Sequence, residues 1–186
     1  NHVYKFSIIN KDSINLKYLY KYSEGSAASE TKRFCNNDEC IKTAFVKDHN
    51  LWIGSIDEEV QITKDGQDGI VYGQSVHRNE FGINGGLFWS PKGNSLAFYR
   101  MDERRVTEYP IFSITPRPAK PEQFRYPMAG DSSHTVTIGV YNLKKNSLVY
   151  LKTDGPYDQY LTNVTWSPDE KYIYVAWVNR EQNEMQ

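Results

Sequence analysis

The sequence lacks long hydrophobic runs and carries almost no excess of either charge. No segment of the 186 residues approaches the roughly 20 apolar residues that a membrane-spanning helix needs. The 22 basic and 23 acidic residues leave a formal net charge of -1, and neither sign forms a long run. Nucleic acids and anionic membranes are bound by basic surface patches. The composition therefore predicts neither nucleic-acid binding nor a transmembrane segment.

The sequence also lacks an initiator methionine and a secretory signal pattern, since the chain starts NHVYKFSIIN. We therefore expect either a mature product or a piece of a longer protein. The length leaves room for one large domain or two small ones, with enough residues for a substantial hydrophobic core.

Cysteine is scarce, with only Cys35 and Cys40, which have four residues between them. On the two sides of a tight hairpin they could face each other at disulfide distance, or they could remain free thiols. A zinc site would need two more ligands, and no nearby histidine or cysteine supplies them. The sequence leaves the disulfide open, and it predicts no metal and no cofactor.

Aromatic residues, by contrast, are plentiful: they make up 14% of the chain, with 14 tyrosines and 4 tryptophans. Flat, half-buried side chains pack well on a pleated sheet, so this enrichment favours strands. No segment shows a clear helical periodicity of apolar residues. We predict an all-β fold.

One turn occurs twice. Trp89-Ser90-Pro91 and Trp166-Ser167-Pro168 each lie between two segments in which residues alternate. Serine caps such a turn and proline presets its φ angle. We therefore predict two equivalent hairpins, which we name inner hairpins, over residues 86–100 and 163–177.

A second kind of hairpin, which we name the outer hairpin, is predicted over residues 3–21, 51–63 and 136–153, each with a polar turn between two strands. Inner and outer hairpins alternate along the chain, which is typical of four-stranded propeller blades. At roughly 40–50 residues per blade the chain holds about three to four antiparallel blades. Because neither end resembles a closed ring, we expect a partial β-propeller, a fragment of a larger one. A β-sandwich with similar hairpins is the alternative.

Residues 101–135 interrupt this rhythm and contain five of the 8 prolines. Long insertions of this kind are often functional or contact-making. A solvated, irregular loop is the alternative, and the sequence does not choose between them.

Four motifs occur in a specific order along the chain: EFG, FWSPKG, AFYRMD and YPMAG. In this combination the chain resembles the propeller domain of the dipeptidyl peptidase IV family of serine peptidases, and above all the bacterial prolyl tripeptidyl peptidases. The resemblance covers about residues 42–184 and is closest over 70–143. It implies that residues 1–186 are part of one N-terminal β-propeller domain. The catalytic α/β-hydrolase domain of such enzymes is absent from this chain.

No serine of the chain lies in the Gly-x-Ser-x-Gly elbow of such hydrolases, since neither GQSVH nor GDSSH fits it. Without a nucleophile, His77 and His134 have no triad to serve, and we interpret both as ordinary surface or loop histidines. We predict no catalytic residue, and no catalysis by this chain alone.

In the family, a segment just before the Trp-Ser-Pro strand carries glutamates that bind the free α-ammonium of the peptide. The resemblance places Glu80 on the glutamate position and Asn79 where dipeptidyl peptidases usually have a second carboxylate. Glu80 and Asn79 are thus the predicted substrate-binding residues, and Asn79 suits tripeptide release better than strict dipeptide release. Arg78 would either hold Glu80 in place or point to solvent. We expect Gly82 and the Gly85-Gly86 pair to let this backbone leave the sheet and return.

The resemblance implies a substrate-gating propeller in a serine exopeptidase that releases N-terminal di- or tripeptides after proline. The expected partners are a peptide with a free N-terminus and the hydrolase domain of the same polypeptide. Asp102, Glu103 and Tyr109 open the insertion, which in relatives forms an arm that can touch a partner subunit, so a homodimer is possible. The resemblance implies export, so we expect the protein in the periplasm or at the cell surface. The competing hypothesis is a non-catalytic propeller that binds a protein or ligand as a scaffold.

Overall fold

The computed structural model describes residues 2–10, 13–21, 32–36, 39–55 and 58–186, with side chains from Lys42 onward. Within these residues the chain consists of β-strands, turns and one short 3-10 segment, η1 (His77–Gly82). The prediction of an all-β fold is confirmed. No described helix is long and apolar enough to span a lipid bilayer.

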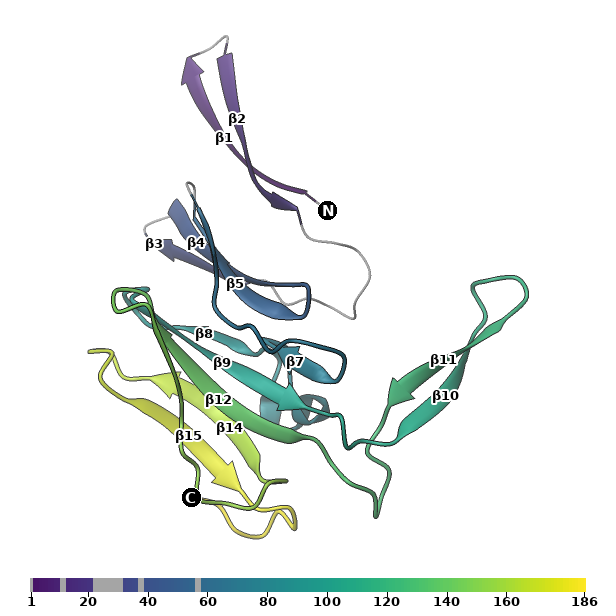
Figure 1. Cartoon of the computed structure of the whole chain (residues 1–186). Helices are drawn as coiled ribbons and strands as arrows, with labels where there is room; N and C mark the ends of the chain where they lie inside the picture. Colours follow the sequence, from purple (N-terminus) through teal and green to yellow (C-terminus); the bar gives the residue numbers. More distant parts are fainter. Residues whose placement is uncertain (1, 11–12, 22–31, 37–38, 56–57) are drawn as a thin grey trace.

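The strands form successive antiparallel sheets along the chain (Figure 1). The first complete sheet contains β3 (Lys32–Asn36), β4 (Glu39–Lys47), β5 (Asn50–Gly54) and β6 (Glu59–Gln61). The second contains β8 (Leu87–Trp89), β9 (Ser95–Asp102), β12 (Thr135–Asn142) and β13 (Ser147–Tyr150), and β7 (Ile70–Tyr72) also pairs with β9. Two hairpins flank them: β1 (His2–Asn10) with β2 (Ser13–Lys21), and β14 (Tyr160–Trp166) with β15 (Ile173–Val178).

All five predicted hairpins are present. The outer hairpins are β1–β2, β5–β6 and β12–β13, and the inner hairpins are β8–β9 and β14–β15. Two complete blades with a half-blade on either side account for these strands, so the described part of the chain is a partial β-propeller.

The two Trp-Ser-Pro turns have the same hydrogen bonds. Ser90 Oγ accepts from the amide of Ser95, and Ser167 Oγ accepts from the amide of Tyr172, both over 3.0 Å. In the last position of the turn, Gly93 has a φ angle of 65° and Glu170 one of 62°. The two turns therefore have the same structure as well as the same sequence motif. The second turn has a glutamate with left-handed backbone at the position where the first has glycine.

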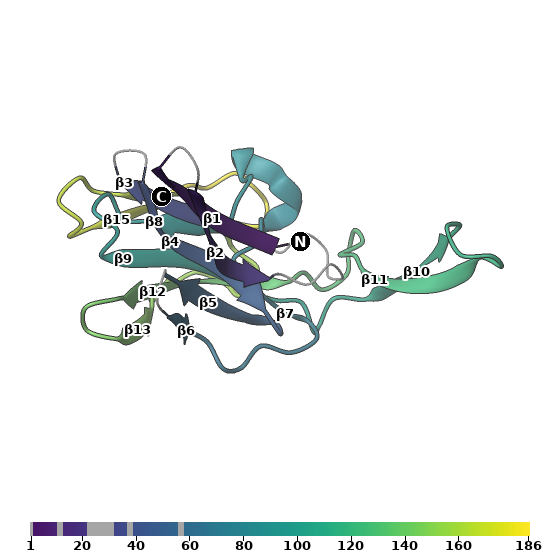
Figure 2. The same ribbon diagram turned by 90° about the horizontal axis from the view of Figure 1, so that it is seen from above.

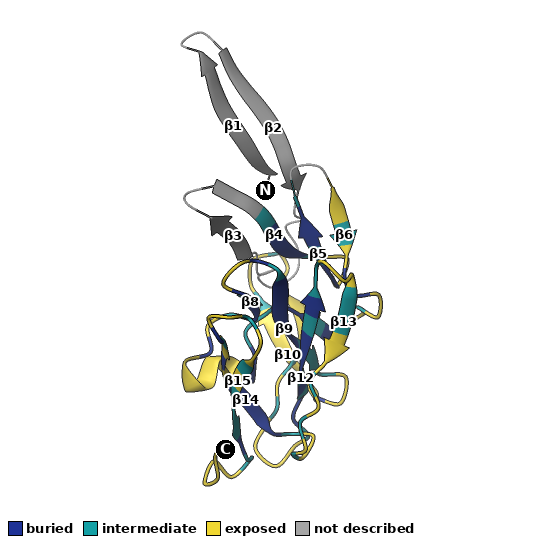
Figure 3. Ribbon diagram, turned by 90° about the vertical axis from the view of Figure 1, so that its left-hand side faces the viewer, coloured by how far each residue is buried: buried dark blue, intermediate teal, exposed yellow. Residues whose placement is uncertain are grey.

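The core lies between successive sheets, because β9 is buried on both faces (Figure 3). Leu96 and Phe98 belong to a cluster shared with β5 and β7, while Ala97 and Tyr99 belong to a cluster shared with β12 and β14. The period-two alternation of a strand sends successive side chains to opposite faces. A strand between two neighbouring blades therefore needs apolar residues at successive positions, as β9 has from Leu96 to Tyr99.

Residues 101–135 contain a two-stranded hairpin, β10 (Glu108–Ser113) and β11 (Lys120–Arg125), which projects away from the blades (Figure 2). The interruption was predicted correctly, but the alternative of an irregular loop is wrong. We call β10 and β11 the arm. Cys35 and Cys40 pair in register across β3 and β4, but their side chains lie outside those described, so the choice between disulfide and thiols stays a prediction.

Candidate functional site

The innermost strand of the second blade is divided in two by an excursion. β7 and β8 pair with the same edge of β9 in one register, with Tyr72 opposite Arg100 and Leu87 opposite Phe98. Tyr99 lies between these pairs: its carbonyl accepts from the amide of Gly73, and its amide donates to the carbonyl of Gly86. Residues 74–85 therefore leave the strand at one point of the ladder and return at the next.

Two glycines close this excursion. Gly73 has a φ angle of +66°, which favours glycine, and a Cβ atom there would lie 2.8 Å from Leu87 Cδ2. A Cβ atom on Gly86 would lie 2.1 Å from the carbonyl oxygen of Gln74, which is backbone and cannot move aside freely. The prediction that glycines bend the chain here is correct for Gly86 and for Gly82, whose φ angle is +71°, but it missed Gly73.

The tip of the excursion is η1, whose backbone is unusual. His77, Arg78, Asn79 and Phe81 all have φ angles between 53° and 62°. Left-handed backbone costs a residue other than glycine about 1 kcal/mol or more, and such clusters persist only where surrounding contacts hold them. Glu80, at the centre, has an ordinary φ angle of -65°.

His77 forms a buried pair with His134. Its Nδ1 lies 3.1 Å from His134 Nε2, and its Nε2 accepts from the amide of Leu161 over 3.4 Å. Because Nε2 accepts, the neutral ring carries its proton on Nδ1, and this N–H donates a hydrogen bond to His134 Nε2. The exposed fractions are 4% for His77 and 7% for His134, so the interpretation of both as surface histidines is wrong, although His134 does lie in a loop just before β12.

Burial sets the protonation of this pair. Burial lowers the pKa of His77 to about 3, with His134 and Arg180 adding to the effect. Burial likewise lowers the pKa of His134 to about 4, helped by Arg78 and Arg180. Both rings are neutral at pH 7. Arg180 completes the cluster, because its Nη1 donates to Tyr160 Oη over 2.9 Å and to Ser133 Oγ over 3.3 Å.

Arg78 points toward the arm. Its guanidinium carbon lies 4.8 Å from the ring centre of Phe124 and 4.9 Å from that of Tyr126. Its Nη2 donates a short hydrogen bond to the carbonyl oxygen of Arg125. The side chain is exposed but rests on the base of the arm, so it neither contacts Glu80 directly nor points freely into solvent.

The other two left-handed residues are also held. The hydroxyl of Ser75 donates to Asn79 Oδ1, and the Phe81 ring lies 5.1 Å from that of Tyr160. Glu80 is exposed, and its Oε2 has a single described partner, Gln182 Nε2, at 3.5 Å. The loop therefore fixes every strained side chain and leaves one carboxylate available.

A cleft of about 320 Å³ separates residues 74–79 from the base of the arm. Arg78, Glu103 and His134 are among its lining residues. Burial raises the pKa of Glu103, although Arg125 and Arg78 oppose the shift. The cleft lies beside the strained loop, and the polar groups around it can contact a ligand that reaches the loop.

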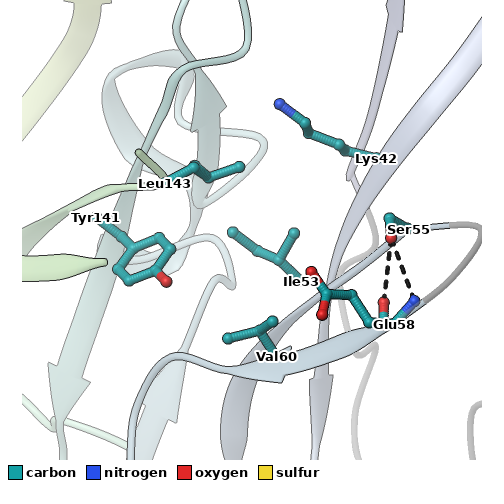
Figure 4. Close-up of a pocket in the computed structure, with 7 residues that line it drawn as sticks. All are labelled: Lys42, Ile53, Ser55, Glu58, Val60, Tyr141 and Leu143. Carbon is teal, nitrogen blue, oxygen red and sulfur yellow. Dashed lines mark hydrogen bonds between the residues drawn. The ribbon is translucent and has the colours of Figure 1, made fainter. Parts of the chain in front are cut away.

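A second hollow, of about 160 Å³, lies between the first and second blades (Figure 4). Lys42 and Glu58 are its charged residues. Lys42 Nζ donates to the carbonyl of Gly93 over 2.8 Å, and burial lowers its pKa. None of the predicted site residues lines this hollow, and no group of three or more potential metal ligands occurs in the described residues.

The alternating hairpins, the buried central blade and the looped inner strand define the chain as part of a β-propeller. It belongs to the family of the dipeptidyl peptidase IV (DPP IV) N-terminal region, whose family model matches residues 6–186. The predicted family resemblance is thus confirmed.

Individual relatives agree. A Tuber melanosporum protein named probable dipeptidyl-aminopeptidase B is 36% identical over 166 residues, covering 75% of this chain and 18% of the fungal protein. A crystal structure from Bacteroides ovatus, assigned as a dipeptidyl aminopeptidase IV, is 50% identical with a TM-score of 0.70, over 77% of this chain and 20% of that one. Porphyromonas gingivalis dipeptidyl peptidase 4 has the same fold, with a TM-score of 0.75 and 24% identity over 99% of this chain and 28% of that one. The chain thus spans less than a third of each relative.

The family resemblance predicts Glu80 and Asn79 as substrate-binding residues, but no sequence pattern predicts the residues that contact the loop around them. Ser75, Phe124, Tyr160 and Gln182 come from four different segments and carry no motif. Gln182 lies 102 residues from Glu80, and no spacing rule connects positions so far apart. Only the packing of the arm and the next blade against η1 brings them together.

Proposed function

We propose that this chain is the substrate-gating part of an exopeptidase that removes N-terminal di- or tripeptides after proline. Residues 1–186 belong to one N-terminal propeller, and a serine-type α/β-hydrolase domain of the same polypeptide supplies the catalytic triad. The chain alone does not hydrolyse peptides. The protein works in the periplasm or at the cell surface, where it meets peptides with free N-termini.

The observation that carries this proposal is the arrangement of η1. Four consecutive or neighbouring residues accept left-handed backbone, and each has a side-chain contact that holds it. Strain that is maintained in this way is typical of sites that hold a ligand. The residue that the loop presents is Glu80, exposed and almost without partners.

Glu80 has the chemistry to bind an α-ammonium group. The group has a pKa of about 8 and is largely charged at neutral pH, and a carboxylate accepts charge-assisted hydrogen bonds from it. Asn79 would act differently from a second carboxylate. Because its Oδ1 already accepts from Ser75, its amide NH₂ is the group that would donate to a carbonyl of the peptide.

The arm gives a reason to expect a second subunit. Ile111, Phe112 and Ile114 are 49%, 68% and 85% exposed, and apolar side chains gathered at the end of a projecting hairpin are typical of contact surfaces. A homodimer that uses the arm is therefore part of the proposal. A non-catalytic propeller that uses the same surface as a scaffold is the competing function.

The proposed binding of the peptide's α-ammonium group by Glu80 can be tested in the full-length enzyme. Glu80→Gln should lower kcat/KM for a free-amine peptide that carries proline before the scissile bond by about 100-fold, the scale of a lost charge-assisted bond in a desolvated site. The N-acetylated peptide should be a poor substrate for both enzymes, with little further loss in the variant. Glu181→Gln removes the same charge from a neighbouring loop and should leave both values within about twofold.

Equal penalties of Glu80→Gln on free and acetylated peptides would show that Glu80 does not bind the amine. A full-length protein without any peptidase activity would favour the scaffold function instead.

A further inference from the structure

The arm and η1 are joined at Arg78. The guanidinium lies over two rings at the base of the arm, Phe124 in β11 and Tyr126 just after it, and one of its N–H groups donates to the carbonyl of the residue between them, Arg125. A planar guanidinium can stack on aromatic rings and donate hydrogen bonds at its edge at the same time. All three contacts come from the point where β11 returns to the blade.

This part of the arm is itself anchored. Arg125 makes two hydrogen bonds to Asp68, of 3.1 and 2.7 Å, and an ion pair of 3.0 Å with Glu108. The amide of Tyr126 donates to the carbonyl of Thr107. Arg78 therefore rests on the fixed base of the arm, next to the ladder that holds the blade together.

Arg78 is two positions from Glu80, and its own backbone is left-handed, with φ 54° and ψ 36°. Such a conformation relaxes unless the side chain is held. The described contacts include no hydrogen bond or ion pair between Arg78 and Glu80. Arg78 therefore supports Glu80 through the backbone of η1 and not by a direct described contact.

We infer that Arg78 is a positioning residue that fixes η1 against the base of the arm and thereby places the Glu80 carboxylate for its ligand. This inference rests on the proposed role of Glu80. It also makes the arm part of the site, because a displaced arm base removes the support on which Arg78 rests. A free-amine peptide then meets a carboxylate that is correctly aimed only while the arm base is in place.

A lysine at position 78 can distinguish the stacking of the guanidinium from an effect of its positive charge alone. Lysine would keep the positive charge but has neither a planar face nor a forked set of donors. Arg78→Lys should therefore behave like Arg78→Ala. Phe124→Ala removes the support from the other side and should have the same effect, so the two changes should not be additive.

The test uses the full-length enzyme with Arg78→Ala, Arg78→Lys, Phe124→Ala and the double variant Arg78→Ala/Phe124→Ala. Tyr172→Ala, which also removes an exposed aromatic ring (63%) but lies outside the arm, is the matched control. For the free-amine peptide we expect each variant except the control to raise KM by about tenfold, the scale of a lost cation–π contact, while kcat changes by less than about twofold. The double variant should be within about twofold of Arg78→Ala. The acetylated peptide should be unaffected.

Hydrogen exchange of residues 74–85 gives a readout that does not depend on activity. It should become faster in the Arg78 and Phe124 variants and stay unchanged in Tyr172→Ala and in Glu80→Gln. Unchanged exchange in Arg78→Ala, full recovery of KM by Arg78→Lys, or multiplied KM effects in the double variant would each overturn the inference. Faster exchange in the Arg78 variants, together with no amine selectivity at Glu80, would support the role of Arg78 in fixing η1 but contradict the proposed role of Glu80. The two failures are therefore distinguishable.

Discussion

His77 Nδ1 lies 3.1 Å from His134 Nε2, and this buried contact ties the strained η1 to the segment that returns from the arm. The folded protein holds both rings neutral, because burial lowers their pKa values to about 3 and about 4. An unfolded chain has an ordinary histidine pKa of about 6.5. Below that pH the histidines bind protons in the unfolded state but stay neutral in the folded state. The free energy of unfolding therefore falls as the pH drops.

We therefore expect full stability above about pH 6.5, and a loss of about 2 kcal/mol for each histidine at pH 5. His134→Gln should remove one of these contributions, so its stability should depend less on pH over the same range. The measurement is hydrogen exchange of propeller peptides of the full-length protein across a urea series at pH 7 and pH 5. An equally steep pH dependence in the wild type and in His134→Gln would contradict the prediction.

Gly86 closes the excursion by close approach, so Gly86→Ala should be strongly destabilising. The added Cβ would meet the Gln74 carbonyl oxygen at 2.1 Å, and we expect a loss of about 3 kcal/mol or more in the free energy of unfolding. Gly82→Ala is the matched control: its φ angle is +71°, but no atom lies within 4 Å of an added Cβ. That change should cost only about 1–2 kcal/mol for the left-handed backbone. Urea unfolding of both variants checks the order, and a larger loss for Gly82→Ala would contradict it.

Glu170 joins the two Trp-Ser-Pro turns, because its carboxylate accepts from the Lys92 amide and from Asn94 Nδ2, both over 2.7 Å. Glu170→Ala should lose both bonds and keep the left-handed backbone, at a cost of about 2 kcal/mol. Glu170→Gly should lose less, because glycine removes the backbone cost at the position that Gly93 occupies in the other turn. Thermal unfolding of the two variants decides this, and the opposite order would show that the backbone there is not strained.

The contact of Glu170 also depends on pH, but its pKa is lowered by hydrogen bonds and not by burial as for the two histidines. Burial raises the pKa, but hydrogen bonds from Ser90, Asn94 and the turn backbone outweigh burial and lower it overall. The stabilisation is therefore present above the ordinary glutamate pKa and is lost as the pH falls through the lowered value. Glu170→Gln should flatten this part of the acid unfolding curve.

Much of the fold could be predicted because its signals are local. The Trp-Ser-Pro turns, the alternation of β9 and the polar turns of the outer hairpins each lie within about 20 residues, the range over which turn chemistry and strand periodicity act. The prediction for Glu80 rests on the family resemblance of the segment beside such a signal. The histidines could not be interpreted correctly, because burial depends on the return of the arm and on the next blade.

The sequence by itself determined the strands and their order along the chain, since these depend on side-chain alternation and on turn residues close together in the chain, whereas Glu80 is a prediction from the family resemblance. Only the tertiary structure decided how that residue is held. Gly73 and Gly86 meet across the excursion, Arg78 rests on Phe124 and Tyr126, and His77 meets His134. These contacts join segments far apart in the chain, and a left-handed loop persists only where such contacts offset its backbone cost.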